Sequence, residues 1–411
     1  MKVVGIIAEY NPFHNGHAYH LQESKKRAGA DCAICIMSGP FTQRGEPALW
    51  DKWTRAEAAI ASGVDLVLEL PFVYACNHAD LFAQGAISIL DGLGCVDTLS
   101  FGSESGDLEA LCNARDRLLA AEAEIYQQVR RYNKEGHSFP KARYLALTQV
   151  LGENETQIFR EPNHILAIEY LKHLKLLGSS IQPLTIPRLG VGYHDLGSVF
   201  QREHRMHLAS ATGIRTALHN GESVDQLIPA PTRDVLQSHH GTADVGMEDL
   251  YQLLQYRIHW MGPMELKQVF SVTEGLEHRI AEASIHSSSV EELIQRIKSK
   301  RFTQTRIQRM LIHILLGLTQ DRLAKAISKN ALYGRILGFS DQGAKLLKQI
   351  RKQESNLIPI ITNVNRQASP ESPLWDALLL DCMANDLYQL IARGEYYAGS
   401  DRVRKPVRFS C

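Results

Sequence analysis

The sequence lacks an excess of either charge, since its 45 lysines and arginines equal its 45 aspartates and glutamates. The chain as a whole therefore has no electrostatic bias toward nucleic acid, and only the local distribution of charge can indicate such a ligand. Long apolar runs are also missing. None approaches the roughly 18 residues of a membrane span, and Asp65 and Glu69 interrupt even residues 64–70. The N-terminal apolar stretch is too short for a secretory signal, so we expect a cytoplasmic protein without membrane contact.

Cysteine is scarce and odd in number, with seven residues scattered over 411 positions. This excludes a disulfide scaffold and indicates reduced thiols. Cys32 and Cys35 have Cys-x-x-Cys spacing, but they lie in the apolar run 32–37 and no second pair completes a zinc site. A buried strand explains the pair better than metal or redox chemistry, and we expect no dedicated metal site.

The chain is long and rich in apolar residues. Its 411 residues, of which 44% are hydrophobic, can bury a large core and favour two domains. Up to about residue 190, strand-like and helix-like segments alternate, which predicts an α/β fold with a Rossmann-like, mostly parallel sheet. The predicted strands are residues 3–7, 32–37, 66–70, 98–101 and 183–186, and the predicted helices are 53–61, 79–90, 108–121 and 165–177.

After Met247 strand signals nearly vanish, while helical periodicity continues through residues 290–298, 306–316 and 374–391. The polar, proline-containing residues 220–246 are the best candidate for a connection. We therefore predict an α/β domain over residues 1–220, a connection over 221–246 and an all-helical domain over 247–411.

The most informative segment is a strand followed by a tight turn that ends in His14-Asn15-Gly16-His17, where a helix over residues 18–28 begins. Helix N-termini carry unpaired N–H donors and a partial positive charge, so they bind anions. The imidazoles of His14 and His17 add two donors on one side of the first turn. Such donors can stabilise charge during attack at an α-phosphorus. Alternatively, these histidines are loop residues satisfied by backbone carbonyls.

This block resembles the His-Ile-Gly-His signature of the nucleotidyltransferase superfamily, with Asn15 in place of Ile. More closely, residues 8–17 resemble the opening of the tRNA(Met) cytidine acetate ligase family, and the likeness covers most of the chain. The resemblance implies that His14 and His17 are catalytic, that ATP is a substrate accompanied by Mg²⁺, and that acetate and elongator methionine tRNA are partners. The positions that it assigns to ATP are Ile7, Ala8, Glu9, Tyr10, Asn11, Pro12, Phe13, His14, Asn15, Gly16, His17, Ala18, Tyr19, His20, Gly102, Asn163 and Arg188.

Three of these positions have ordinary structural interpretations as well. Gly102 follows a predicted strand and could simply form a turn. Asn163 suits the N-cap of a helix. Arg188 follows a strand and could form a surface salt bridge, although its planar guanidinium could also clamp a phosphate.

Ser210, Thr212 and Arg215 resemble the Ser-x-Thr-x-Ile-Arg element with which nucleotidyltransferases hold the β- and γ-phosphates. Hydroxyl and guanidinium donors suit that task. Ala211 stands where many relatives have a second Ser, and the element could equally begin a helix.

A basic segment at residues 296–309 contains six cations and no acid, which favours phosphate contact over a merely solvated face. Arg335 and the tail 402–408 add further positive charge. No base-reading motif is present, so RNA recognition would depend on shape, backbone contact and single-stranded bases. The candidate tRNA-binding residues are Lys298, Lys300, Arg301, Arg306 and Arg309.

The sequence supports an ATP-dependent RNA-modifying ligase first, because both halves of the chain then have a task. The resemblance specifies acetate, activated as acetyl-adenylate, and the wobble cytidine as its acceptor. One alternative is a small-molecule adenylyltransferase of the same superfamily, which would not need a long helical half. Another is a non-catalytic RNA-binding protein with a nucleotide-sensing domain, although a sensor needs no donors placed for charge that develops during a reaction.

Overall fold

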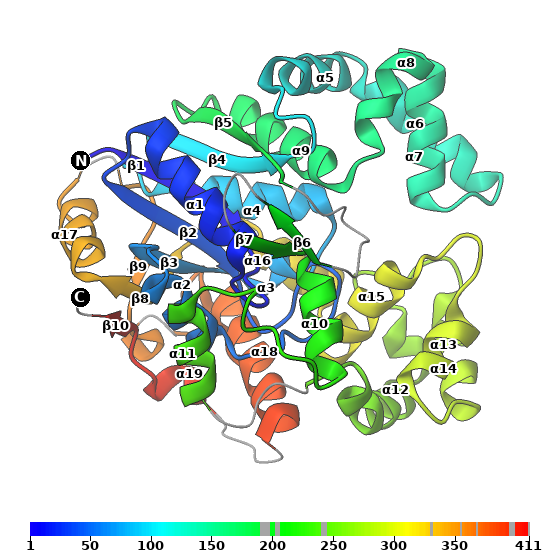
Figure 1. The fold of residues 1–411 in the computed structure, drawn as a ribbon. Coiled ribbons are helices and arrows are strands. Elements are labelled where there is room, and N and C mark those ends of the chain that lie inside the picture. Colours follow the sequence, from blue (N-terminus) through cyan, green and yellow to red (C-terminus); the bar gives the residue numbers. More distant parts are fainter. Residues whose placement is uncertain are drawn as a thin grey trace.

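The computed structural model describes residues 1–189, 198–201, 206–239, 245–328, 332–353, 356–366, 369–393 and 399–409. Within these ranges one large sheet carries helices on both faces, and two groups of helices lie beside it (Figure 1). No described helix has both the length and the apolar character that crossing a membrane requires.

The centre of the sheet is parallel, as predicted, and every strand expected in the first half is present. The strand order is β10-β8-β3-β2-β1-β4-β5, so β1 lies between β2 on one side and β4 on the other. The chain therefore changes direction across the sheet at β1. The five parallel strands are β1 (Val3–Ala8), β2 (Cys32–Ser38), β3 (Leu66–Leu70), β4 (Thr98–Ser103) and β5 (Gln182–Pro187).

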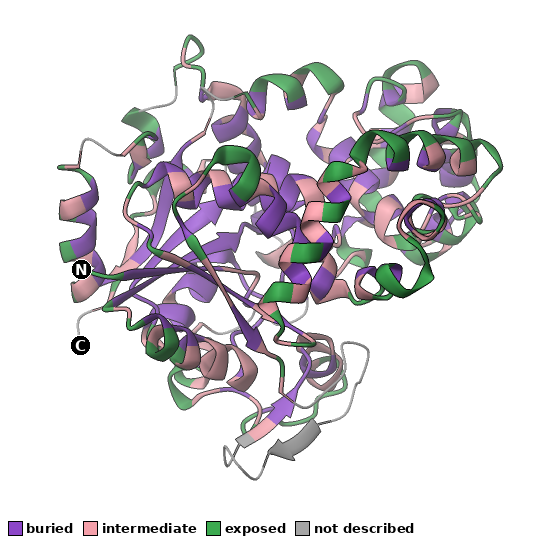
Figure 2. Cartoon of the chain, turned by 90° about the horizontal axis from the view of Figure 1, so that it is seen from above, coloured by how far each residue is buried: buried purple, intermediate pink, exposed green. Residues whose placement is uncertain are grey.

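Helices cover both faces of this sheet, which explains why its strands are apolar on both sides (Figure 2). Val4 and Ile6 pack with Leu21 on one face, whereas Ile34 and Ile36 pack with the second, larger core. The first face is covered by α1 (Asn15–Ala28) and α2 (Lys52–Ala61), and the second by α3 (Phe72–Ala75), α4 (Ala79–Gly92) and α9 (Pro162–Leu177).

The predicted Cys-x-x-Cys strand is confirmed. Cys32 and Cys35 are free and buried in β2. Burial raises the pKa of the two thiols to about 11 and about 12. Thiolates are the reactive and metal-binding form, so both side chains serve as core residues.

A helical group between β4 and α9 was only partly predicted. The expected helix 108–121 is α5, but the three helices after it were missed. In α6 only Ile125 and Val129 are buried, so its apolar pattern is too sparse to stand out. The group consists of α5 (Leu108–Ala120), α6 (Glu122–Lys134), α7 (Phe139–Leu151) and α8 (Glu153–Thr156).

The second half is mainly helical, and the helices expected near residues 290–298, 306–316 and 374–391 are confirmed. The predicted connection contains a helix of its own, α11, while its residues 240–244 lie outside the described ranges. The helices are α10 (Ala211–His219), α11 (Ala230–Ser238), α12 (Tyr251–Leu266), α13 (Leu276–Ile285), α14 (Val290–Ile297), α15 (Gln304–Leu316), α16 (Gln320–Ala326), α17 (Asp341–Ile350), α18 (Trp375–Arg393) and α19 (Ser400–Val403).

The prediction that residues 247–411 are all helical was wrong, because β8 (Gly334–Ser340), β9 (Ile360–Ile361) and β10 (Val407–Phe409) join the large sheet, with β8 antiparallel to β3. The signal in β8 was masked by Arg335, which is buried against Glu69 and Asp401 at 3.4 and 2.9 Å. Arg335 therefore adds no charge to the surface. A separate hairpin is formed by β6 (Ser198–Gln201) and β7 (Met206–Ala209).

Candidate active site

A cavity of about 310 Å³ opens at the carboxyl ends of β1, β4 and β5. This is the point where the strand order reverses, which is where open α/β sheets place their ligands. Sixteen of the residues proposed from sequence line it. They are Ile7, Ala8, Glu9, Tyr10, Asn11, His14, Gly16, His17, Tyr19, His20, Gly102, Asn163, Arg188, Ser210, Thr212 and Arg215.

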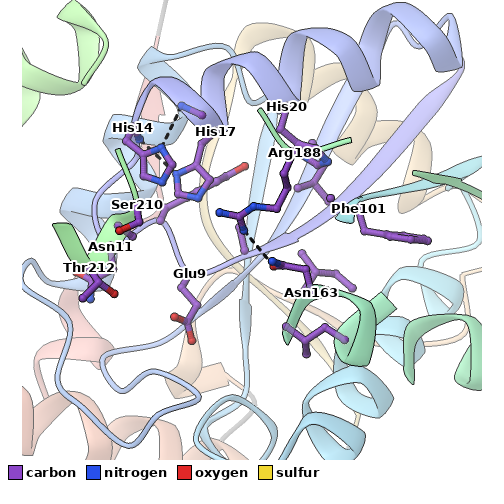
Figure 3. A pocket seen from close by; sticks show the side chains of 18 of the residues that line it. Glu9, Asn11, His14, His17, His20, Phe101, Asn163, Arg188, Ser210 and Thr212 are labelled. Carbon is purple, nitrogen blue, oxygen red and sulfur yellow. Dashed lines mark hydrogen bonds between the residues drawn. The ribbon is translucent and has the colours of Figure 1, made fainter. Parts of the chain in front are cut away.

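The two signature histidines lie at the start of α1, which begins three residues earlier than predicted. His14 is the N-cap, and its Nδ1 accepts from Gly16 N at 3.0 Å. Nδ1 of His17 accepts from His14 N at 3.3 Å, which completes a capping box. The two rings stack with centroids 3.7 Å apart. Backbone N–H groups therefore orient both imidazoles, and the same rings line the cavity (Figure 3).

Gly16 provides space beside the His14 side chain. Its backbone is not in the left-handed region. A Cβ there would lie 2.9 Å from His14 Cε1 and 3.1 Å from Nδ1. The glycine leaves space for the His14 imidazole to fold over the turn.

The surroundings keep these histidines neutral. Burial, with help from Arg188 and Arg215, lowers the pKa of His14 to about 3. Burial and His14 together lower the pKa of His17 well below its usual value, while the Pro12 carbonyl acts in the opposite direction. Because Nδ1 of each ring accepts a hydrogen bond, the ring proton belongs on Nε2. Each ring is therefore a neutral N–H donor at neutral pH, and the Pro12 carbonyl accepts a hydrogen bond from His17.

Arg188, Asn163 and Glu104 form a chain of hydrogen bonds at the other side of the cavity. Arg188 Nη1 donates to Asn163 Oδ1 at 3.1 Å (Figure 3). Asn163 Nδ2 donates in turn to Glu104 Oε1 at 2.6 Å. The N-cap of α9 is Glu161, so the capping interpretation of Asn163 was wrong. Arg188 makes no ion pair within the described part of the chain, and its guanidinium stays available to an anion.

Gly102, in β4, lies next to Arg188 of this hydrogen-bonded series. A Cβ there would meet Arg188 Cγ at 3.5 Å, an ordinary contact, and the next nearest atom would be Ile186 O at 3.9 Å. The glycine thus leaves the floor of the cavity open rather than forming a tight turn.

Ser210, Thr212 and Arg215 support both interpretations of their segment. Ser210 caps α10, since its Oγ accepts from Gly213 N at 3.0 Å. Arg215 donates to Asn11 O at 3.1 Å and to Thr212 Oγ1 at 3.3 Å. The start of α10 therefore faces the same cavity as the histidines.

Four proposed positions do not line the cavity: Pro12, Phe13, Asn15 and Ala18. Phe13 is buried in the core, with its ring centroid 4.7 Å from that of Tyr10. Tyr10 itself has φ of 45°, a left-handed conformation that turns the chain out of β1. These residues shape the loop that carries the histidines.

The far wall of the cavity was not predicted from the sequence. Part of it is the loop after β2, where Gln43 N donates to Glu9 Oε1 at 2.8 Å. The Gly39-Pro40 turn directly after an apolar strand could have indicated this loop, because it lies at the same edge of the sheet. The additional lining residues include Thr42, Gln43, Arg44, Glu46, Phe82, Phe101, Leu166 and Tyr170.

The predicted basic segment is less free than its sequence suggests, because acids from outside it compensate several charges. Glu274 pairs with Arg301 at 2.9 Å, and Arg306 is partly buried over the Phe302 ring. Arg309 Nη1 donates to Gln43 O at 3.1 Å, so this residue supports the cavity wall. Lys298 and Lys300 remain exposed.

The tail is compensated in the same way, since Arg404 lies 3.4 Å from Asp51 and Arg408 lies 3.3 Å from Asp341. Two of the four cations in the tail, Arg404 and Arg408, therefore have acidic partners, whereas Arg402 and Lys405 are exposed.

Asp80, Glu169 and His173 are close enough together to hold a metal ion. However, Lys172 Nζ lies 2.5 Å from Asp80 Oδ1 and 2.9 Å from Glu169 Oε2. The ammonium group already neutralises the acids, which makes the cluster a structural ion-pair network.

Comparison with known proteins matches residues 1–402 to the family described as HIGH Nucleotidyl Transferase. The tRNA(Met) cytidine acetate ligase of Thermoanaerobacter sp. (strain X514) is 41% identical over 415 residues, which covers 99% of this chain and 100% of the relative. That of Alkaliphilus metalliredigens (strain QYMF) is 39% identical, covering 98% and 97%. Two crystal structures of Thermotoga maritima TmcAL, one apo and one bound with alpha-thio ATP, have TM-scores of 0.90 and 0.89 at 32% identity, each covering 100% of both chains. The similarity thus includes the C-terminal strands as well as the cavity.

Proposed function

The chain belongs to the HIGH nucleotidyl transferase family and, within it, to the tRNA(Met) cytidine acetate ligases, and on this basis we propose how its cavity carries out the ligation. ATP binds with its triphosphate between α1 and α10. Acetate attacks the α-phosphorus, pyrophosphate leaves, and the acetyl-adenylate passes its acetyl group to the exocyclic amine of the wobble cytidine in elongator methionine tRNA.

The observation that carries this proposal is the convergence of neutral and cationic donors on one cavity. His14 and His17 supply neutral N–H groups, while Arg188 and Arg215 supply charge. Such preorganised donors stabilise the charge that develops on the α-phosphoryl and leaving oxygens. We propose His14 and His17 as the catalytic pair.

The remaining contacts divide between the two ends of the nucleotide. Gly102, Asn163 and Arg188 would hold the nucleoside and α-phosphate side, and Ser210, Thr212 and Arg215 the β- and γ-phosphates. The loop from Ile7 to His20 would supply backbone and side-chain contacts, with Pro12, Phe13, Asn15 and Ala18 acting through its shape.

We expect Mg²⁺ to accompany ATP. The donors at the phosphate end are imidazole, hydroxyl and guanidinium groups, which do not form an oxygen cage for this ion. When bound, Mg²⁺ would therefore be held by phosphates and water, and it would neutralise phosphate charge.

For domain organisation, we propose that residues 1–220 carry the ATP chemistry and that helices within residues 247–411 contact the tRNA. The loop 42–46 supports this arrangement, because α15 packs directly on it. Gln308 Nε2 donates to Glu46 Oε1 at 3.1 Å. A Cβ on Gly45, which has φ of 78°, would lie 2.3 Å from Arg309 N. The helical region is thereby joined to the cavity wall.

The test is to incubate pure protein with ATP, acetate and unmodified methionine tRNA and to analyse the nucleosides by mass spectrometry. We expect acetylcytidine that depends on all three substrates. Omitting acetate while supplying acetyl-CoA should give none. If AMP is transferred to a phosphorylated metabolite without any tRNA dependence, the protein is a small-molecule adenylyltransferase and the proposal fails.

A further inference from the structure

Glu9 is the one residue in the signature loop whose charge does not suit a polyphosphate. It follows β1 directly, and its carboxylate lies on the side of the cavity away from the His14–His17 pair (Figure 3). A carboxylate repels phosphate groups, so this side chain calls for a role other than holding the triphosphate.

The position of Glu9 is fixed from two directions. Its Oε1 accepts from Gln43 N at 2.8 Å. Its backbone carbonyl accepts from Arg55 Nη1 at 2.6 Å, and the same buried guanidinium donates to Ser38 O at 3.1 Å. No donor to Oε2 occurs among the residues that the structure describes. One oxygen is anchored and the other is left for a ligand.

The environment makes this carboxylate a stronger base than an exposed glutamate. Burial raises its pKa, and the nearby Glu46 carboxylate acts in the same direction. The hydrogen bond from Gln43 N and the charges of Arg215 and Arg55 lower the pKa and favour ionisation. The cavity also contains the aromatic side chains of Phe82 and Tyr170, from α4 and α9. Both rings are buried, so they give this part of the cavity an apolar wall against which a pyrimidine ring can lie.

Resting on the proposed function, we propose that Glu9 is the general base of acetyl transfer and that Oε2 receives a proton from the exocyclic amine of the acceptor cytidine. The amine of a cytosine ring is a weak nucleophile because its lone pair is delocalised into the ring. Removing its proton as the bond to carbon forms compensates for that weakness.

The step balances without another reactant. The amine nitrogen forms a bond to the acetyl carbonyl carbon, and the bond from that carbon to the phosphate oxygen breaks. The electron pair of the broken bond leaves with AMP, and the amine proton goes to Glu9 Oε2. Glu9 then releases the proton to solvent and returns to its ionised form.

The experiment separates the two half-reactions. Acetate-dependent pyrophosphate exchange measures adenylate formation, and single-turnover transfer from added acetyl-adenylate to methionine tRNA measures the second step. Glu9→Gln keeps an oxygen for Gln43 N but cannot take the proton. We expect transfer to fall by about 10²-fold or more, and by at least about tenfold more than exchange, which Glu9 affects only through the loop that contacts ATP. Glu23→Gln, which removes a half-buried carboxylate of α1 that is paired with Arg27 and does not line the cavity, should leave both rates unchanged.

A parallel fall in both half-reactions, or transfer at the wild-type rate in Glu9→Gln, overturns the inference. Because the Gln variant could fail to fold, the wild-type pH profile provides a second test. Transfer, but not exchange, should slow on the acid side as Glu9 becomes protonated, and Glu9→Asp should retain that limb. A transfer rate that does not change toward acid pH also overturns it. A wild-type protein that shows neither half-reaction contradicts the proposed function itself.

Discussion

Asn15 Nδ2 donates to the carbonyl of His207 at 2.9 Å and also to that of Gln226 at 2.8 Å. The backbone N of Asn15 donates to Leu227 O at 3.0 Å. The residue that departs from the His-Ile-Gly-His signature thus fastens the start of α1 to the segment that carries Ser210, Thr212 and Arg215. The departure has a structural purpose.

We therefore predict that Asn15→Ile, which restores the signature, weakens the site. Loss of two hydrogen bonds should cost about 1–2 kcal/mol of unfolding free energy. The KM for ATP in pyrophosphate exchange should rise several-fold, because the phosphate-binding helix start is no longer held in place. Asn220→Ala, at the exposed end of α10, is the control. An unchanged KM with reduced stability would show that the hydrogen bonds of the Asn15 side chain do not position the site.

A second prediction concerns the paired imidazoles. His14→Asn should lower acetate-dependent pyrophosphate exchange by about 10²–10³-fold, the usual effect of removing one preorganised donor. Asparagine is an equally good N-cap, so the helix should keep its start and the fold should survive. His17→Ala should reduce exchange similarly. If both variants exchange at the wild-type rate, these rings are not the catalytic donors.

Residues close together in sequence could be predicted well. His14, Gly16 and His17 share one turn after an apolar strand, so their spacing alone indicated a common site. Gly102, Asn163 and Arg188 were found through resemblance. Nothing in their local pattern shows that β4, α9 and β5 bring them together, since that depends on strand order.

What the sequence could not reveal depends on long-range pairing. β8 was missed because Arg335 interrupts its apolar pattern, and only Asp401 and Glu69, far away in the chain, explain why a guanidinium can be buried there. The basic segment was overestimated for the same reason, because Glu274 lies outside the window in which charges were compared. A count of charges along the chain does not include partners supplied by the fold.

A third prediction follows from a buried histidine outside the cavity. His313 Nε2 lies 2.8 Å from Cys76 O and Nδ1 lies 2.9 Å from Ser271 Oγ, and burial lowers its pKa to about 4. The unfolded chain binds a proton at this residue below about pH 6.5, whereas the folded chain does not. The contribution of neutral His313 to the free energy of unfolding should therefore be fully present above about pH 6.5 and should be lost as the pH decreases toward 4.

For His313 this loss should reach about 1 kcal/mol at pH 5.5. The measurement is urea unfolding of the ligand-free protein at pH 7.5 and 5.5. The difference between the two pH values should be smaller in His313→Gln than in wild type by about that amount. Identical pH dependence in the two proteins would contradict the assignment.

The last prediction concerns the tRNA surface, where Lys298 and Lys300 are the exposed members of the basic segment. The double variant Lys298→Ala/Lys300→Ala should raise the Kd for methionine tRNA several-fold. It should also reduce the salt dependence of binding, because fewer counterions are released from the RNA when fewer phosphates are contacted. Pyrophosphate exchange without tRNA should be unchanged, since neither residue lines the cavity. Lys325→Ala, which breaks a surface pair with Asp321 on α16, is the matched control. If the lysine variant loses exchange as well, or if tRNA affinity does not change, the RNA does not bind at this end of α15.

Arg309→Ala should behave differently, because its guanidinium holds Gln43 and through it Glu9, so it should slow acetyl transfer even at saturating tRNA.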